Sequence, residues 1–293
     1  MAFRRLFCLF KNHSSASKDS GQTFLIILLV TAVILTIGLA IASYSITNIR
    51  ISRYEEESAR AFSAAEAGIE EALKLGAAPE SGLVDIGDIT AEVSETIQGG
   101  GIDFDFAGSK FESEELANIW LVGHTDEGAL DPSTYFPANG SITICWGDDT
   151  TIGGNTPAIE ATILYQDGGT FKVARGAFDP KADRGNGFDV ADSISGGNCG
   201  DLAFAEDLDL AADFSIPGTA IPYSLRLRLF YNPKLEPIAV SASDNLPLQG
   251  KCYESQATIT ESSVSRKVRQ CQFYESPPGI FDYVLFSTGD LVK

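Results

Sequence analysis

The chain has 293 residues, with 40 acidic against 21 basic side chains and a net charge of −19. This balance disfavours the basic patches that release counterions from phosphate, so we expect no nucleic-acid partner. The sequence has only two histidines and no GxSxG, Walker, GxGxxG or HExxH pattern, which indicates a protein that is not an enzyme and uses no cofactor.

The most informative feature is an uncharged stretch from Gly21 to Ile49 that continues into a polar sequence without any helix breaker. About 20 apolar residues span a bilayer as a helix of about 30 Å, and residues 24–44 meet that requirement. The sequence predicts one long helix over residues 22–76, with a membrane span in its first half and an amphipathic second half.

In the amphipathic half, apolar side chains recur at helical spacing. Phe62, Ala65, Ile69 and Leu73 form a stripe on one face of the predicted helix. We expect this stripe to pack the helix against a β-sheet formed by later residues.

The charges at the two ends of the apolar stretch predict its orientation. Four basic side chains and one acid give the first 20 residues a net charge of +3, whereas the remainder is strongly acidic. Basic residues resist translocation, so residues 1–21 are predicted to be a cytoplasmic leader. The protein is therefore expected in the cell membrane as a single-pass protein, with residues 77–293 outside the cytoplasm.

After Gly76 the hydrophobic pattern changes from the period of a helix to the period of a strand. Together with the long helix this predicts an α+β fold with an antiparallel β-rich domain. The expected strands are 83–97, 102–106, 142–146, 159–165, 171–173, 224–231, 238–240, 256–260, 264–271 and 281–287. Strands 159–165 and 171–173 are expected to form a hairpin that turns at Asp-Gly-Gly (167–169). In 224–231, the leucines at 225, 227 and 229 are expected to face one way and Arg226 and Arg228 the other. Short helices are expected at 113–120 and 201–209, and residues 176–218 read as an irregular surface excursion.

Four cysteines follow the helix, namely Cys145, Cys199, Cys252 and Cys271. An even number on the oxidising side of a membrane predicts two disulfides, with buried free thiols as the alternative. The absence of a CxxC pair disfavours zinc. Acid pairs such as Asp148 and Asp149, Asp103 and Asp105, or Asp207 and Asp209 could hold calcium through oxygen ligands, but none has the EF-hand spacing. Adjacent carboxylates usually solvate a loop, so no metal site is predicted and calcium stays the alternative.

The spacing of two cysteines also suggests their pairing. Cys252 and Cys271 are symmetric about residues 261–262, so a hairpin that turns there places them directly opposite each other. Cys145 would then pair with Cys199 and tie the long excursion to a strand.

Two segments of the predicted helix resemble a known family. GQTFLIILLV (21–30), after a short basic leader, resembles the N-terminus of type IV prepilins, with Gly21 before the cleaved bond and Gln22 as the new N-terminus. AFSAAEAGIEEAL (61–73) is similar to the amphipathic half of PilX-like minor pilins. Scattered segments at 157–165, 174–180 and 277–287 resemble pilus-assembly proteins.

The resemblance implies a function in assembly. The chain would be a minor pilin or pilin-like subunit of a type IV pilus or related secretion filament at the cell surface. Its partners would be prepilin peptidase, membrane lipid before assembly, and other pilin subunits through the N-terminal helix. Major pilins usually carry Glu five residues after the cut, where this chain has Ile26. This departure implies a subunit of low copy number at the filament end.

Two other readings of the apolar stretch stay open. Ala40-Ile41-Ala42 matches a small-residue cleavage site, so the stretch could be a secretory signal, although it exceeds the usual apolar core of about 7–15 residues. The chain could also be an unprocessed membrane-anchored extracellular binding or adhesion protein. The mature N-terminus separates the three readings: Gln22 for the pilin, Ser43 for the secreted protein, and an uncut leader for the anchor.

Overall fold

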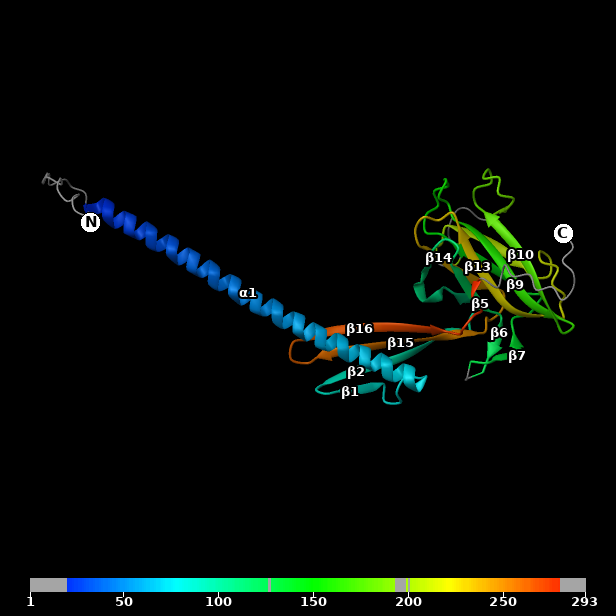
Figure 1. Cartoon of the computed structure of the whole chain (residues 1–293), viewed down its shortest axis with the longest axis horizontal. Coiled ribbons are helices and arrows are strands. Elements are labelled where there is room, and N and C mark those ends of the chain that lie inside the picture. Colours follow the sequence, from blue (N-terminus) through cyan, green and yellow to red (C-terminus); the bar gives the residue numbers. More distant parts are fainter. Residues whose placement is uncertain (1–19, 126–127, 193–198, 200, 280–293) are drawn as a thin grey trace, which may run out of the picture. The chain divides into compact units, whose positions relative to one another are not determined.

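The computed structural model describes residues 20–125, 128–192, 199 and 201–279 (Figure 1). It contains one long helix followed by antiparallel strands, which confirms the predicted α+β class. The chain divides into two units. One comprises the helix up to Arg60 with residues 259–264; the other, called the head domain below, comprises the described residues of 61–258 and 265–279.

Helix α1 (Ser20–Leu75) has nearly the predicted bounds. It ends before Gly76, whose φ of +70° is a left-handed conformation that glycine adopts without a side-chain clash. Lys251 Nζ donates to the carbonyl of Gly76 at 3.1 Å and forms an ion pair with Glu95, so a cation lies at the negative end of the helix. Gly21 and Gln22 fall in the first turn of α1, and their side chains lie outside the described residues.

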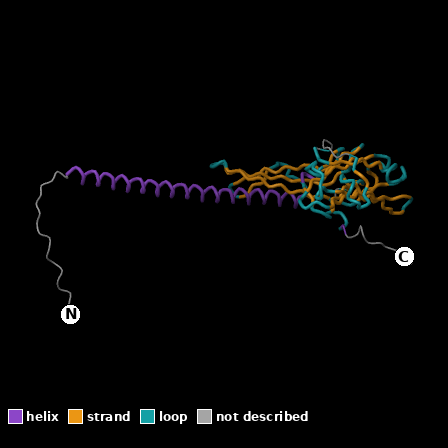
Figure 2. The backbone as a smooth tube through the Cα atoms, turned by 90° about the horizontal axis from the view of Figure 1, so that it is seen from above, coloured by secondary structure: helices purple, strands orange, loops and turns teal. Residues whose placement is uncertain are grey.

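The last part of α1, residues 61–75, packs on a four-stranded sheet with the order β1-β2-β15-β16. These strands are β1 (Leu83–Ile86), β2 (Ile89–Gly99), β15 (Leu248–Ile259) and β16 (Val264–Phe273). Alternate residues of β2 and β15 are buried, and Val93 and Tyr253 form a cluster with Ile69 and Ala72 of the helix. Figure 2 distinguishes the helix from these strands by colour.

The buried face of the helix differs in part from the predicted stripe. Ala65 and Ile69 are buried as expected, whereas Phe62 and Leu73 are 44% and 38% exposed, so their predicted packing on the sheet is wrong. The buried positions belong mostly to small residues: Ala61, Ala64, Ala65, Gly68 and Ala72. Small side chains let the helix backbone lie close to the sheet. A prediction of the buried face that relies mainly on large apolar residues does not identify these small residues.

Most of the remaining strands form two sheets that enclose a large hydrophobic cluster and so make a sandwich. One sheet has the order β11-β10-β9-β13-β5; the other has the order β12-β8-β14-β3, and β4 also pairs with β14. The strands are β3 (Asp103–Phe104), β4 (Lys110–Phe111), β5 (Leu116–Trp120), β8 (Ser141–Trp146), β9 (Ala158–Asp167), β10 (Thr170–Asp179), β11 (Asp189–Val190), β12 (Phe204–Asp209), β13 (Ile221–Phe230) and β14 (Glu236–Ala242). A 3₁₀ turn, η1 (Phe106–Gly108), follows β3, and β6 (Val122–His124) pairs with β7 (Leu130–Tyr135).

Several predicted elements are confirmed. β9 and β10 form the expected hairpin, and both glycines of its two-residue turn, Gly168 and Gly169, have positive φ, as a tight turn of this length requires. Leu225, Leu227 and Leu229 of β13 are fully buried. The alternating Arg226 and Arg228 are also buried, although the pattern suggests a solvent face. Arg226 donates to the carbonyl of Pro277, and Arg228 lies 3.8 Å from a Glu160 oxygen.

Other predicted elements are wrong. The expected helix at 113–120 is strand β5, paired with β13, and the expected helix at 201–209 is strand β12, paired with β8. Long-range pairing overrides local preference in both segments. Residues 176–218 are not a simple excursion, because they include the end of β10, β11 and β12. The expected strand at 281–287 lies outside the described residues.

Both predicted disulfides are formed. Cys252 and Cys271 lie in β15 and β16, with Cα atoms 3.9 Å apart, and the hairpin turns at residues 260–263. Cys145 of β8 is bonded to Cys199, with Cα atoms 5.9 Å apart. The second bond ties Cys199 to β8 of the sandwich.

One buried side chain joins the helix-bearing sheet to the sandwich. Gln249 accepts from the backbone N–H of Trp120 at 2.7 Å and donates to its carbonyl at 2.8 Å. The amide also donates to the carbonyl of Pro247 at 2.8 Å. Gln249 therefore supplies the hydrogen bonds that a neighbouring strand would otherwise make to the outer edge of β5.

The contact between Gly68 and Ser255 gives a first prediction. A Cβ at Gly68 would overlap the Ser255 hydroxyl, which is buried and has no hydrogen-bond partner among the described residues. We expect Gly68→Ala to destabilise the protein by about 1–3 kcal/mol in thermal unfolding of the full chain in detergent. Ser255→Ala alone should be neutral or stabilising, and the double variant should recover most of the loss. Stabilisation by Gly68→Ala alone would mean that helix propensity outweighs the contact.

The Gln249 contacts give a second prediction. Gln249→Ala leaves the Trp120 N–H and carbonyl buried without partners, so we expect a loss of about 2–4 kcal/mol in unfolding free energy. Gln256→Ala, at an exposed position of the same strand, serves as the control and should change it by less than about 0.5 kcal/mol. Similar losses in both variants would contradict the assigned role of Gln249.

Candidate functional site: the apolar helix and the disulfide-bonded head domain

The first half of α1 exposes apolar side chains on all its sides. Every residue from Phe24 to Glu56 is exposed, and the first charged side chain of this range is Arg50. A helix that is apolar on every side requires lipid or other helices around it. Within the described residues, α1 is the one helix long and apolar enough to cross a membrane, so it is a candidate membrane anchor.

Polar side chains within this half are compatible with apolar surroundings. The hydroxyls of Thr31 and Thr36 each donate to the helix carbonyl three residues earlier, and Thr47 donates to the carbonyl of Ser43, all at 2.9 Å. Groups that bond within their own helix do not need water as a partner. The two disulfides indicate that the head domain lies outside the cytoplasm, because such bonds persist in oxidising compartments.

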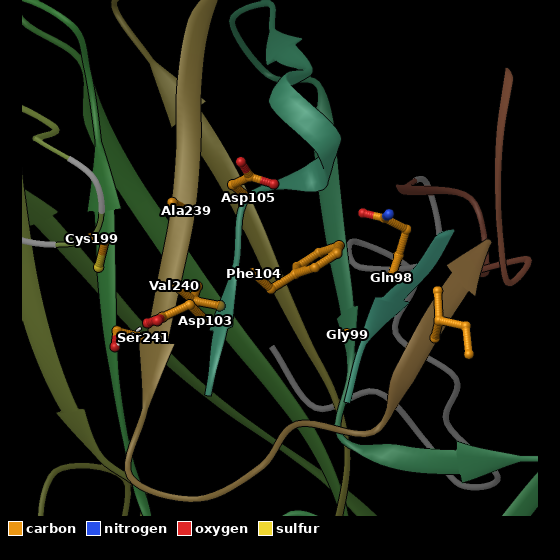
Figure 3. Close-up of a pocket in the computed structure, with 10 residues that line it drawn as sticks. Gln98, Gly99, Asp103, Phe104, Asp105, Cys199, Ala239, Val240 and Ser241 are labelled. Carbon is orange, nitrogen blue, oxygen red and sulfur yellow. Dashed lines mark hydrogen bonds between the residues drawn. The ribbon is translucent and has the colours of Figure 1, made fainter. Parts of the chain in front are cut away.

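The head domain has a hollow of about 660 Å³ where the end of β2 meets β3 and β14 (Figure 3). Asp103 and Asp105 line it, but both carboxylates already accept hydrogen bonds from the protein. Ser241 Oγ donates to Asp103 at 2.6 Å, and the backbone N–H of Ala107 donates to Asp105 at 3.0 Å. The hollow therefore offers polar surface without an evident acid–base pair or nucleophile.

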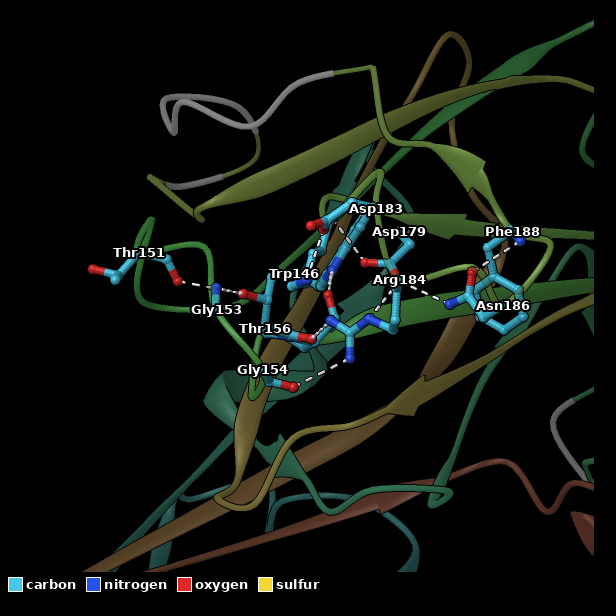
Figure 4. A network of polar contacts seen from close by, with 12 residues as sticks. Trp146, Thr151, Gly153, Gly154, Thr156, Asp179, Asp183, Arg184, Asn186 and Phe188 are labelled. Atoms are coloured by element: carbon cyan, nitrogen blue, oxygen red, sulfur yellow. Dashed lines mark hydrogen bonds and ion pairs between the residues drawn. The ribbon is translucent and has the colours of Figure 1, made fainter.

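A buried ion pair organises the turn after β10 (Figure 4). Arg184 Nε lies 2.7 Å from Asp179 Oδ2, and Asn186 donates to the same oxygen at 2.8 Å. The guanidinium also donates to the Thr156 carbonyl at 2.8 Å and lies over the Tyr231 ring, 4.0 Å from its centre. Because one carboxylate neutralises the guanidinium, and carbonyl oxygens and an aromatic ring occupy its other sides, the network has the character of a structural brace.

The acidic pair considered for a cation, Asp148 and Asp149, is also engaged by the protein. Lys234 and Lys110 lie 2.6 and 2.9 Å from Asp148, and they hold the pKa of that carboxyl well below its ordinary value. Burial raises the pKa of the neighbouring Glu236. In the described ranges no group of three or more His, Cys, Asp or Glu side chains could hold a metal ion.

His124 contacts aromatic side chains. Its ring stacks on Tyr274 with centres 4.0 Å apart and meets the edge of Trp120 at 4.9 Å. Burial lowers the pKa of the imidazole, which favours the neutral ring. Nδ1 is buried without a hydrogen-bond partner in the described part of the chain, so the geometry supports packing and not acid–base chemistry.

A carboxylate that the sequence pattern does not identify is Glu206 in β12. The residue is only 8% exposed, and burial raises its pKa to about 7. The backbone N–H of Asp192 donates to it at 2.8 Å, and the charges of Asp192, Asp213 and Asp207 add to the upward shift. Its place between Phe204 and Leu208, which share its face of the strand and belong to the core cluster, could be expected only from the strand pairing.

Comparison with known protein families, with curated proteins and with solved structures gives no match for this chain. The function must therefore be inferred from the properties of α1 and the head domain.

Glu206 makes the stability of the head domain depend on pH. Its raised pKa means that the folded state binds the proton more tightly than the unfolded state, so stability is lost as pH rises from about 5 through 7. We expect Glu206→Gln to raise the unfolding free energy at pH 8 by up to about 3 kcal/mol and to change it little at pH 4.5. Chemical unfolding at both pH values measures this difference. Glu92→Gln, at an exposed position, is the control, and a pH-independent effect of Glu206→Gln would contradict the assignment.

Proposed function

We propose that this chain is a minor pilin or pilin-like structural subunit of a type IV pilus or related secretion filament. The observation that supports it most is the two-part surface of α1. The helix is apolar on every side in its first half, and small residues of its second half pack on a sheet of the head domain. The head domain would lie outside the membrane.

The proposed mechanism is assembly. Lipid covers the first half of α1 after insertion, and prepilin peptidase removes the leader after Gly21. The helix then moves into a bundle with other subunits, which keeps its apolar surface covered, so little hydrophobic free energy opposes the transfer. The position at the filament end that Ile26 suggests stays a prediction.

A second candidate is a membrane-anchored extracellular binding or adhesion protein that keeps its leader. The hollow beside β3 favours this alternative, because a binding protein needs a concave surface. The two candidates share the anchor and differ in the processing of the N-terminus.

Processing at Gly21 is the direct test of the proposal. The resemblance implies that the peptidase accepts a residue without a side chain before the cut. We expect mass spectrometry of the membrane-extracted protein to show Gln22 as the first residue, and Gly21→Val to retain the leader and block assembly while insertion persists. Gly38→Val is the matched control, because Gly38 has no neighbouring atom within 4 Å of an added Cβ.

Each alternative has its own outcome. An uncut leader in the unmodified chain would favour the anchored binding protein, and Ser43 as the first residue would favour a secreted one. Normal processing of the Gly21→Val variant would overturn the proposal.

A further inference from the structure

A second hollow of the head domain, of about 340 Å³, lies between the β6–β7 pair and the segment that joins β14 to β15. Pro247 and Leu248 form one wall, and His124, Thr134 and Tyr135 form the other. Among the described residues it has no lining residue in common with the hollow beside β3. It is therefore a separate concave surface within one unit of the chain.

Glycines leave the space of this hollow open. A Cβ at Gly123 would collide with the Thr134 hydroxyl, and a Cβ at Gly100 would lie 3.0 Å from Leu248 Cδ2. Both glycines line the hollow. A larger residue at either position would have to displace a side chain of the wall.

Contacts within the head domain hold both walls in place. The N–H of Leu246 donates to the carbonyl of Gly101 at 2.9 Å, which fixes the segment before β15. On the other wall the His124 ring stacks on Tyr274. A ligand therefore meets a preformed surface, which reduces the entropic cost of binding.

The polar side chains of the hollow are free to bind a ligand. Thr134, Tyr135 and Asn245 are exposed, and among the described residues none of these three side chains makes a hydrogen bond. Hydroxyl and carboxamide groups can each donate and accept. Three such side chains around one hollow suit a ligand whose own groups also do both, as the hydroxyl groups of a sugar do.

The hollow also has an apolar part. Tyr135 and Leu248 are 45% and 42% exposed, and Pro247 lies beside Leu248. A tyrosine ring combines a flat apolar face with a polar hydroxyl at its tip. A sugar ring has matching parts, because its C–H groups form apolar faces and its hydroxyls project from the rim.

The charge and the size of the hollow narrow the class of ligand. None of the described residues that line it is an acid, a lysine or an arginine, and burial lowers the pKa of His124, which favours the neutral ring. The net charge of −19 repels anions, and a cation would find no carboxylate among the described lining residues. A volume near the lower end of the range of about 300–1,000 Å³ for small-molecule sites suits a single ring better than a peptide.

We propose that this hollow binds the terminal neutral hexose or N-acetylhexosamine of a glycan. The Tyr135 ring covers an apolar face of the sugar, and Thr134 and Asn245 bind its hydroxyl groups. The proposal goes beyond the assembly function and does not depend on it, because every residue concerned lies in the head domain.

Saturation-transfer NMR on the full chain tests the proposal, in a detergent without a sugar head group. The probes are the methyl glycosides of glucose, galactose, mannose and N-acetylglucosamine, with glucuronic acid as the charged comparison. We expect at least one neutral glycoside to bind with a Kd of about 1–10 mM, and glucuronic acid to bind about tenfold more weakly or worse. Absence of binding by all four glycosides, or equal binding of glucuronic acid, would overturn the proposal.

Substitutions locate the binding in this hollow. Tyr135→Ala and Asn245→Ala should each weaken it about tenfold or more, whereas Tyr135→Phe keeps the ring and should weaken it less than about fivefold. Phe171→Ala and Gln256→Ala remove an exposed aromatic ring and an exposed carboxamide elsewhere in the head domain, and they should not change it. Thermal unfolding checks that every variant is folded. Undiminished binding by Tyr135→Ala or Asn245→Ala, or an equal loss in the two controls, would contradict the assignment.

The mature N-terminus of the same protein separates this inference from the proposed function. If Gln22 is the first residue and no glycoside binds, the sugar site is wrong and the proposed function stands. If the leader is uncut and a neutral glycoside binds, the proposed function fails and the sugar site supports the anchored binding protein.

Discussion

The close approach of α1 to its sheet determines which surfaces the protein presents. Gly68 lies against Ser255 with no space for a Cβ, and the flanking contacts are made largely by alanines. Small side chains bring two backbones together and gain dispersion contacts along the whole interface. Phe62 and Leu73 are therefore exposed to solvent. The helix face toward the sheet is buried, whereas the opposite face presents apolar and acidic side chains.

The head domain depends on its own core and covalent bonds. Its two sandwich sheets enclose one large hydrophobic cluster, the Arg184–Asp179 pair holds the turn after β10, and Gln249 and both disulfides link strands or segments that are distant in sequence. None of these contacts involves the apolar first half of α1. A domain whose stability is independent of that half can remain folded whether lipid or protein surrounds the helix, and the proposed transfer from membrane to filament requires this property.

The features predicted correctly from sequence are those with local causes. The helix, its end at Gly76, the hairpin at Gly168–Gly169 and the Cys252–Cys271 bond all follow from periodicity, turn chemistry or symmetric spacing. Local patterns do not predict the strands at 116–120 and 204–209, because these segments are strands through their pairing with β13 and β8, which lie far away in sequence. Arg226 and Arg228 alternate as a solvent face would, and their burial depends on contacts with the distant Pro277 and Glu160. The candidate site shows the same limit of local reasoning. The pKa of Glu206 is raised by burial in paired strands, and strand pairing is not visible in the local sequence.

The two halves of α1 supply interactions of different kinds. Contacts among uncharged apolar side chains are non-directional, so a bundle of such helices gains similar free energy at many axial offsets. A carboxylate within the apolar half would select one offset, but Ile26 provides none. Within the described part of α1, charged side chains begin at Arg50, beyond the apolar half, where water reduces the cost of a charge that has no close partner. The apolar half therefore holds the helix in apolar surroundings without selecting an axial offset, and any selection of an offset has to come from the polar half or from the head domain.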